Sequence, residues 1–532
     1  MAKKKLKLKK FNLHPVTSMI LLIALVIIVS FILHLFKAST TYNVINVETG
    51  QIKTEVVKVV NQMNYKGVKT LISDALKNFV SFAPLGTLLV TLIGLGVAEA
   101  TGLIDTVLRR RILKIPPRTV TFLLLLLAIF SSIVNEVGYA VMIPLGALVF
   151  LINGRNPLAG IATAFAGVAF GYSISFFVGS TDIALLPYTR VAANLIDEGF
   201  HVSMTSNLFI MIASCVILAA IGTVAAENFA IKRFGRYLSK TRDDLGQTKE
   251  IEFLDLKYEE QKKLKEDSYE KKGLRWALIT SIVVVLLFIY MVIPGLPLSG
   301  MLLDLNEEAY VNQLFGTNSY FHDGFTYMTA IYFALSGIAY GIGAKSIKND
   351  KDLINSLVEK LKEVGLVIVM IFFASQLITV FKATNIGVYI TALFTNLLKS
   401  LPVNGWLLII ISMIFIAISN LFMPNSLSKW SIISPVLVPL MMQSNISPQF
   451  CQYIFRAAES MTNGITPLLA YFIVYLAYLN IYNKDLERPI TIKKGINYML
   501  PYMLWFIIGW ILIIMAWYII GLPLGPGVMP TL

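Results

Sequence analysis

Long uninterrupted apolar runs are the main feature of this chain. Segments 16–36, 276–293 and 495–520 contain no Lys, Arg, Asp or Glu. A helix needs about 20 apolar residues to cross the hydrocarbon core of a bilayer, which is roughly 30 Å thick. The number and spacing of such runs predict an all-α polytopic membrane protein with about nine transmembrane helices.

Two further apolar segments carry polar residues at their middle. Segment 119–152 holds Asn135-Glu136, and segment 401–440 holds the stretch 420–428. Each is followed by a span that turn-forming residues interrupt. Backbone in lipid must satisfy its own hydrogen bonds, so such breaks must face protein or a water-filled cavity. We therefore predict two re-entrant helical hairpins and two broken helices, the latter within residues 156–190 and 450–481.

The two broken units occur in the same order, which indicates an internal repeat. Residues 99–103 lead into 109–116 before the first hairpin, and residues 382–386 lead into 397–402 before the second. Matched breaks in two halves are typical of secondary transporters whose binding site lies between the repeats. Lys and Arg mark cytoplasmic loops, and only the first hairpin has them close to both of its ends, so we expect the two repeats to be inverted.

This pattern divides the chain into four parts. Residues 1–78 comprise a basic tail, the first transmembrane helix and an external loop, and residues 79–226 form the first repeat. Residues 227–323 hold a cytoplasmic linker, a connecting transmembrane helix and an external loop, and residues 324–532 form the second, inverted repeat. Six lysines in residues 1–10 favour a cytoplasmic N-terminus, so we expect a multi-pass protein of the inner (cytoplasmic) membrane.

Composition narrows the class of function. Hydrophobic residues make up 56 % of the chain and charged residues 14 %, against about 25 % charged in soluble proteins. Mean hydropathy is +0.71. The net charge of +14 lies in loops between spans, so it records orientation and gives no indication of nucleic-acid binding. No metal spacing, nucleophile elbow or phosphate loop is present, which leaves a polytopic membrane enzyme or a channel as weaker alternatives.

Ionisable residues within the spans are candidates for function, because each costs about 2.5–3.5 kcal/mol to insert. Arg456 and Glu459 are three residues apart and share a helix face. Glu459 could titrate or contact a coupling ion while Arg456 holds an anionic group, or the two could form a structural ion pair. Asp182 could couple a cation or cap a half-helix. The other members of this set are Glu99, Glu136 and Lys429.

Each remaining candidate has a structural alternative. Glu136 could act at the first hairpin tip or only satisfy orphan amides there, and Glu99 could simply bond to the neighbouring hairpin. We expect Lys429 to extend outward to the membrane surface. Trp430 could stack on an aromatic substrate or pack in the core.

Uncharged polar residues gather at the breaks. Asn135, Ser173 and Asn463 are candidates for substrate contact. Hydroxyls and amide oxygens also suit Na⁺, and half-helix N-termini suit a carboxylate. Capping of the broken helix ends is the alternative, and it can hold together with a binding role. The candidate Na⁺ ligands are Asn135, Ser175, Ser426, Ser428, Thr462 and Thr466.

Several longer motifs resemble the signature of the p-aminobenzoyl-glutamate transporter (AbgT) family. In the first repeat they include Asn135-Glu136-Val137-Gly138-Tyr139 and Gly154-Arg155-Asn156-Pro157-Leu158-Ala159-Gly160. In the second repeat they include Ser428-Lys429-Trp430 and Thr462-Asn463-Gly464-Ile465-Thr466-Pro467. The resemblance extends from about residue 79 to the C-terminus.

The resemblance implies nine transmembrane helices with two hairpins, a bowl-shaped homodimer in the bilayer, and transport of a small organic anion coupled to protons or Na⁺, without a cofactor. Members of the family are linked to uptake of p-aminobenzoyl-glutamate and to efflux of sulfonamide-type antimetabolites; another small carboxylate is an alternative cargo. Matching positions with transport roles in the family are Asp182, Trp430, Pro448, Arg456, Glu459 and Pro467.

The chain departs from the family pattern at four places near the expected site. Glu459 stands where the family has Asp, and Ser173-Ile174-Ser175-Phe176 lacks the family's Asn. Leu186-Pro187-Tyr188-Thr189 replaces a smaller Ala-Gly-Ile-Thr, and Met423-Pro424-Asn425-Ser426 replaces a glycine-serine tip. The resemblance therefore supports a shared transport mechanism more strongly than it supports a shared substrate.

Overall fold

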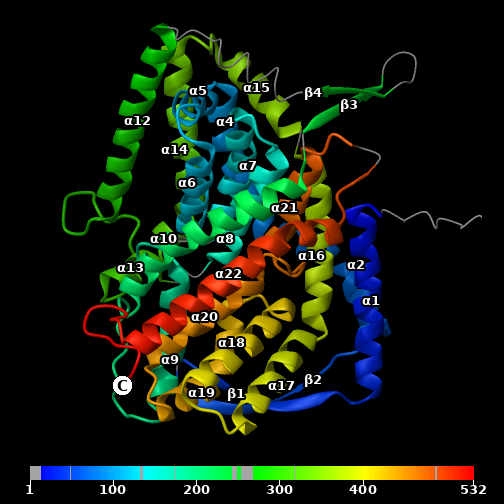
Figure 1. The fold of residues 1–532 in the computed structure, drawn as a ribbon, viewed down its shortest axis with the longest axis vertical. Coiled ribbons are helices and arrows are strands. Elements are labelled where there is room, and N and C mark those ends of the chain that lie inside the picture. The colour runs from blue at the N-terminus through cyan, green and yellow to red at the C-terminus, as the bar shows by residue number, and fades with distance from the viewer. Residues whose placement is uncertain are drawn as a thin grey trace, which may run out of the picture.

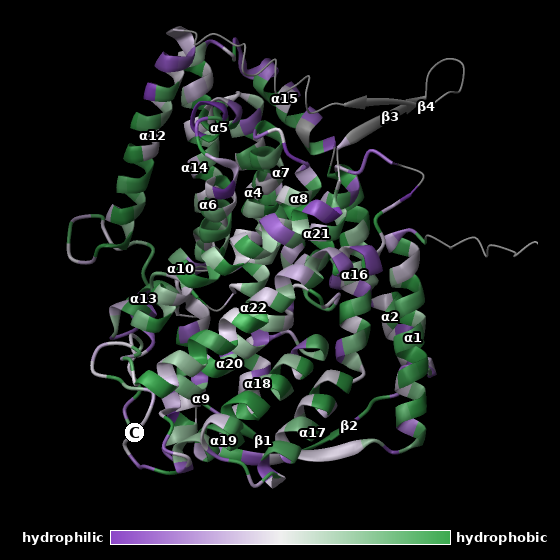
Figure 2. Cartoon of the chain, viewed as in Figure 1, coloured by the Kyte–Doolittle hydropathy of each residue, from purple (hydrophilic) through white to green (hydrophobic). Residues whose placement is uncertain are grey.

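The computed structural model describes residues 13–47, 49–131, 136–172, 174–235, 237–242, 248–252, 268–316, 318–362, 364–485 and 488–532. These residues are mainly helical (Figure 1). Eight of the described helices are long and apolar enough to cross a membrane, which confirms the prediction of an all-α polytopic protein. Figure 2 shows hydrophobic residues along most of α1 and α12, with hydrophilic residues concentrated in the loops and at helix ends.

Seven of the long helices are simple spans. They are α1 (Pro15–Leu35), α4 (Ala83–Ala100), α10 (Leu208–Ala225), α12 (Ser268–Val292), α14 (Tyr320–Ala344), α16 (Gly365–Ala383) and α22 (Ile492–Ile520). Helix α10 continues through a π-helical turn, η2 (Ala226–Ala230), and a 3-10 turn, η3 (Ile231–Arg233). With the two broken helices described below, the described residues contain nine crossings.

The two predicted hairpins are present. Hairpin one consists of α6 (Pro117–Phe130) and α7 (Val137–Ile152), and hairpin two consists of α18 (Gly405–Phe422) and α19 (Ser426–Gln443). Proline at the first helical position begins α6, where the missing N–H costs nothing. Asn425 begins α19, because its side chain accepts a hydrogen bond from the Ser428 N–H (2.9 Å).

Both broken helices start in the same way and break at the same stage. The first consists of α8 (Pro157–Phe170) and α9 (Ser180–Ala193), and the second of α20 (Pro448–Asn463) and α21 (Ala470–Ile481). The Asn156 side chain caps α8 and the Ser447 side chain caps α20, each directly before a proline. The first break comprises the described residues 171–172 and 174–179, and the second comprises residues 464–469.

A short helix joins the first span of each repeat to its hairpin. These are α5 (Leu103–Ile112) after α4 and α17 (Ile386–Ser400) after α16. The residue before each is left-handed: Gly102 has φ +85° and Asn385 has φ +57°. Gly and Asn tolerate this conformation at little cost, so both repeats turn sharply at the same point.

Hairpin one packs closely against the core. A Cβ added to Gly146 of α7 would lie 2.6 Å from the Gly160 carbonyl oxygen of α8, so the helices approach where neither has a side chain. Tyr139 of α7 stacks on Tyr471 of α21 with ring centroids 4.8 Å apart. These contacts join hairpin one to both broken helices.

Several smaller elements were not predicted from the sequence. The segment after α1 holds an antiparallel pair, β1 (Ser39–Asn46) and β2 (Gln51–Lys58), in which Ser39 pairs with Lys58. The linker holds a second antiparallel pair, β3 (Leu238–Arg242) and β4 (Thr248–Glu252). The short helices are α2 (Tyr65–Ser73), α3 (Ala75–Val80), α13 (Tyr310–Phe315) and α15 (Asp350–Lys362).

Candidate functional site

Helix α20 carries a polar face into the middle of the protein. All its residues are buried, and Arg456, Glu459, Thr462 and Asn463 lie near its C-terminal end. Their spacing of three and four residues places them on one side of the helix. The buried charged groups of α20 need partners, because an unpaired buried charge is strongly unfavourable.

Lys429 of hairpin two is one of these partners. Its side chain is fully buried, and its Nζ lies 3.2 Å from Oε2 of Glu459. The same ammonium donates to the Met423 carbonyl oxygen (3.2 Å) and to Oδ1 of Asn420. The expectation that Lys429 extends outward is therefore wrong: docking of the hairpin tip on α20 provides oxygen partners that the membrane surface would otherwise supply.

Asn420 holds the end of hairpin two against the end of α20. Its Nδ2 donates to the Glu459 carbonyl oxygen (2.8 Å), to Oδ1 of Asn463 (2.8 Å) and to Oγ1 of Thr462 (3.1 Å). Ser426 adds a hydrogen bond from its Oγ to Oε1 of Glu459 (2.8 Å). Sequence reasoning placed Asn420 at the tip but did not include it in the site. The available signal was its position at the start of the polar stretch 420–428.

Arg456 of the second repeat connects the cluster to residues of the first repeat. Nη1 of Arg456 lies 3.5 Å from Oδ1 of Asp182, and Nη2 donates to the Tyr172 carbonyl oxygen (3.1 Å). Nε of Arg456 lies 3.7 Å from Oε1 of Glu459 on the same helix. One guanidinium thus lies between the two carboxylates, one from each repeat.

Asp182 has one of its two predicted roles, that of capping a half-helix, and it also forms an ion pair with Arg456. It is in the first turn of α9, and its Oδ2 accepts a hydrogen bond from the Gly179 N–H (3.4 Å). It therefore caps a half-helix while it pairs with Arg456. The cluster contains two cations, Lys429 and Arg456, and two carboxylates, Asp182 and Glu459.

Trp430 is fully buried beside this cluster. Its Nε1–H donates to Oγ1 of Thr189 (3.0 Å), and Thr189 donates to Oε1 of Gln452 (2.5 Å). The indole ring packs on Phe455 with centroids 4.5 Å apart. In this conformation the ring ties hairpin two to α9 and exposes no face on which a substrate could stack.

The two tips and the two breaks line one cavity of about 220 Å³. Glu136 comes from the tip of hairpin one, Tyr172 from the first break, Pro424 from the tip of hairpin two and Leu469 from the second break. Asn463 also lines this cavity. An adjoining cavity of about 700 Å³ shares Glu136 and Pro424 and extends along α16 to residues that include Lys382 and Asn385.

Other predicted residues lie elsewhere or outside the described chain. Pro448 begins α20, about 16 Å along the helix from Glu459 at 1.5 Å per residue, so it is not part of the cluster. Pro467 lies in the second break. Asn135 and Ser173 lie outside the described residues.

Most of the described candidate Na⁺ ligands donate to protein oxygens. Thr462 donates to the Ala417 carbonyl oxygen and Thr466 to that of Leu421, both at 2.8 Å and both in α18. Ser175 donates to the Phe177 carbonyl oxygen, whereas Ser428 is exposed. The two threonine bonds join the second broken helix to hairpin two. In the part of the chain that the structure describes, the oxygen cage made by Asn420, Met423 and Glu459 is filled by the Lys429 ammonium.

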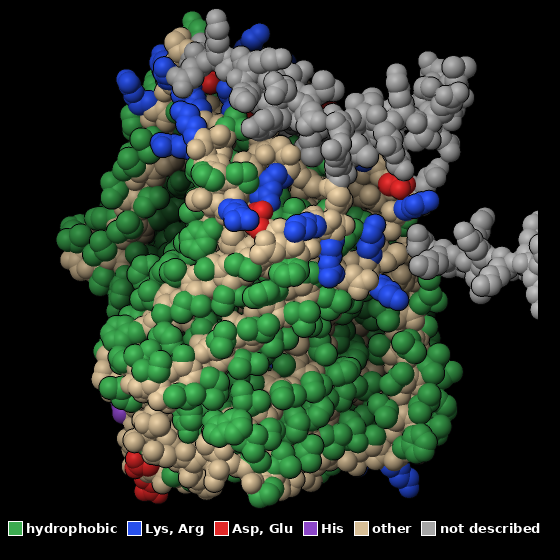
Figure 3. Space-filling view, viewed as in Figure 1, with side chains coloured by type: hydrophobic (Ala, Val, Ile, Leu, Met, Phe, Trp, Pro, Cys, Tyr) green, Lys and Arg blue, Asp and Glu red, His purple; other side chains and the backbone are tan. Residues whose placement is uncertain are grey.

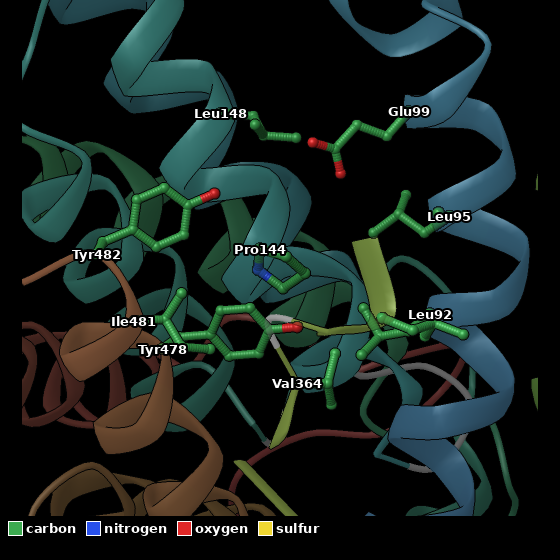
Figure 4. Close-up of a pocket in the computed structure, with 11 residues that line it drawn as sticks. Leu92, Leu95, Glu99, Pro144, Leu148, Val364, Tyr478, Ile481 and Tyr482 are labelled. Carbon is green, nitrogen blue, oxygen red and sulfur yellow. The ribbon is translucent and has the colours of Figure 1, made fainter. Parts of the chain in front are cut away.

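Glu99 lies apart from the central cluster. It faces Leu148 of α7 in a small cavity of about 50 Å³, with Tyr482 and Tyr478 on the other side (Figure 4). Its neighbour is hairpin one, as the sequence suggested. Glu99 is therefore an intramembrane carboxylate against which the cluster residues can be compared.

Comparison with known proteins gives consistent matches along the chain. The family model described as "AbgT putative transporter family" matches residues 10–532. The p-aminobenzoyl-glutamate transport protein of Escherichia coli (strain K12) is 29 % identical over 521 residues, which cover 98 % of this chain and 94 % of that protein. Among solved structures, the YdaH transporter of Alcanivorax borkumensis is 26 % identical, covering 97 % of this chain and 100 % of that one, with a TM-score of 0.48. MtrF of Neisseria gonorrhoeae is 33 % identical, covering 98 % of each chain, with a TM-score of 0.49.

Proposed function

Because this chain belongs to the AbgT family of transporters, we propose that it moves a small organic anion across the membrane and couples that movement to protons. The main support is the buried cluster in which Arg456 lies between Asp182 and Glu459. Each carboxylate comes from a different repeat, and the cavity between the repeats lies beside them. Protonation of either carboxylate changes the charge that faces the guanidinium.

Substrate movement is coupled to proton movement because the Asp182 carboxylate and the substrate carboxylate compete for Arg456. A guanidinium binds a carboxylate through directed N–H donors, whether that carboxylate belongs to the protein or to a substrate. When Asp182 takes up a proton, its attraction for Arg456 weakens, and a substrate carboxylate entering the cavity can take its place. When the substrate leaves, Asp182 returns its proton and pairs with Arg456 again. One proton then accompanies each exchange at this position.

Hairpin two is the gate in this proposal. Its tip is held by Asn420, Ser426 and Lys429, and two of these contact the Glu459 carboxylate directly. Protonation of Glu459 would remove the charge that binds Lys429, so the tip could lift from α20. In this proposal the Glu459 carboxylate both accepts the proton and holds hairpin two against α20.

An aromatic anion such as p-aminobenzoyl-glutamate is the substrate class we propose, because the E. coli relative is named for that compound. We further propose a homodimer in the inner membrane with a cytoplasmic N-terminus. Basic residues at the ends of spans, such as Arg109, Lys345 and Lys493, support that orientation.

Gradient-driven uptake into proteoliposomes tests the proposal. The parent chain should accumulate radiolabelled p-aminobenzoyl-glutamate under an imposed proton gradient, and the same proton gradient with Na⁺ replaced by choline should give the same rate. Asp182→Asn and Glu459→Gln should lose accumulation. Glu99→Gln is the matched control, since it neutralises an intramembrane carboxylate outside the cluster, and it should retain transport.

Two results would contradict the proposal. The first is accumulation that requires a Na⁺ gradient and does not depend on the proton gradient. It would show that coupling comes from a bound Na⁺ ion and not from protonation of the carboxylates. Full transport by both Asp182→Asn and Glu459→Gln would remove the carboxylates from the mechanism altogether.

A further inference from the structure

A second large cavity lies away from the central cluster, beside helices α12 and α14. Its volume is about 840 Å³, and it is bounded by α5, α12 and α14, with Leu145 of α7 at one side. Most of its lining is apolar, including Leu103, Leu274, Ala277 and Phe333. Figure 3 shows a hollow between α12 and the body of the molecule.

The same cavity has a basic rim. Arg110, Arg111 and Lys114 of α5 all line it. Glu270 at the start of α12 pairs with Arg109 (2.6 Å) and with Arg110 (3.0 Å), so one carboxylate is shared by two guanidinium groups. Within the described residues no ion pair joins Arg111 or Lys114 to a carboxylate, and both side chains are exposed. Figure 3 shows Lys and Arg side chains gathered around this end of α12.

An apolar chamber with a cationic rim fits an amphiphile with an anionic head. The wall offers little to a soluble anion, because its hydroxyls at Ser281 and Ser336 bond to each other (2.9 Å). Ile279 and Ile282 of α12 are more than half exposed and do not line the cavity, so the other side of α12 is in contact with lipid. Basic pockets between transmembrane helices bind phospholipid head groups through their phosphate.

We propose that this cavity binds an anionic phospholipid. The phosphate lies between Arg111 and Lys114, with Arg110 supporting it, and an acyl chain lies along Leu274, Ala277 and Phe333. The lipid fills the space between α5 and the α12–α14 pair. Because α5 leads directly into hairpin one, the bound lipid holds the α12–α14 pair in place beside the first repeat.

Lipid titration followed by native mass spectrometry of the full chain in detergent tests the proposal. The probes are dioleoyl-phosphatidylglycerol and dioleoyl-phosphatidylcholine, which share their acyl chains. The double variant Arg111→Ala with Lys114→Ala should bind phosphatidylglycerol roughly 30-fold more weakly, since each surface cation contributes about 1 kcal/mol toward an anionic lipid. The matched control, Lys493→Ala with Lys494→Ala, removes two exposed cations elsewhere and should bind like the parent.

A second variant tests the apolar part of the site. Leu274→Trp should fill the cavity and weaken phosphatidylglycerol binding while leaving the basic rim intact. Equal binding of phosphatidylcholine and phosphatidylglycerol would overturn the proposal. So would displacement of the lipid by excess inorganic phosphate together with no effect of Leu274→Trp, which would indicate a free-anion site. A change of oligomeric state in the double variant would instead identify the cavity as an interface between two copies of the chain.

Discussion

The two hairpins have the same place in their repeats but are fixed at opposite ends. Hairpin one is held at its base, where Arg155 pairs with Glu227 of η2 (2.7 Å) and Thr121 donates to the same carboxylate (2.5 Å). Hairpin two is held at its tip, where Lys429 pairs with the fully buried Glu459. The ion pair and the hydrogen bond at the base of hairpin one are remote from the central cavity, whereas those at the tip of hairpin two depend on the charge of a residue beside it. In the proposed mechanism the first hairpin is therefore a support and the second is the gate.

The broken helices differ in the same way. Helix α8 contains only apolar residues apart from Thr163, and it packs against α7 through Gly160. Helix α20 is equally buried but carries Arg456 and Glu459. The first repeat gives the cluster one backbone carbonyl, at Tyr172, and one carboxylate, at Asp182. The repeat is symmetric in its scaffold and asymmetric in its chemistry.

The largest expected effect comes from removing the buried cation at the gate. Lys429→Met should lower the free energy of unfolding by about 3–5 kcal/mol, because the buried Glu459 carboxylate then keeps only the more distant Arg456 as a cation of the cluster. Thermal unfolding in detergent micelles measures it. The double variant Lys429→Met with Glu459→Gln should recover most of this stability without recovering transport. A single variant as stable as the parent would show that Glu459 does not depend on Lys429.

The second effect concerns how often the gate opens. Asn420→Ala removes the donor to Glu459, Thr462 and Asn463, and leaving buried acceptors unpaired costs about 1–3 kcal/mol. Backbone amides near the hairpin-two tip should then exchange hydrogen for deuterium faster, while those of α7 keep their rate. Hydrogen exchange with mass spectrometry measures both segments in one sample. Equal acceleration in both segments would mean that the variant loosens the whole protein and not the gate.

A smaller effect is expected at the base of hairpin one. Glu227→Gln weakens the contacts with Arg155 and Thr121, which are partly exposed, so we expect a loss of about 1 kcal/mol. Transport rate and its dependence on the proton gradient should stay close to those of the parent, because these contacts are far from the cluster. Uptake into proteoliposomes checks this. Loss of proton dependence in Glu227→Gln would contradict the contrast between support and gate.

The smallest effect is expected at Trp430. Trp430→Phe keeps an aromatic ring against Phe455 but removes part of a buried ring and the hydrogen bond to Thr189, which is worth about 1 kcal/mol. The apparent KM for p-aminobenzoyl-glutamate should change little. A large rise in KM with unchanged thermal stability would show instead that the indole contacts the substrate in another conformation.

Much of the fold was predictable because lipid constrains backbone strongly. A polar residue followed by a turn-forming glycine, such as Asn463-Gly464, within a predicted span indicates a break in the helix that faces protein. The strands β1 and β2 and helix α15 were missed because they lie outside the apolar spans, where no comparable constraint acts.

The site was predictable only where one element carries it. Arg456 and Glu459 share a helix, so their spacing shows that they meet. The environment of Lys429 depends on hairpin two docking on α20, which lies about 30 residues further along the chain and leaves no mark in the local pattern. The local pattern allows the hydroxyls of Thr462 and Thr466 to bind an ion or to cap a helix end. They instead donate to the Ala417 and Leu421 carbonyl oxygens of α18, whose positions depend on how hairpin two packs against α20.

The most direct test is to follow proton movement when substrate is added to proteoliposomes that contain a pH-sensitive dye and no imposed gradient. The parent chain and the Glu99→Gln control should move protons with each substrate translocation. Glu459→Gln should move fewer protons per substrate than the parent, because Asp182 still takes up and returns a proton whereas the gate no longer carries a carboxylate. Proton movement in Glu459→Gln equal to that of the parent would contradict the account.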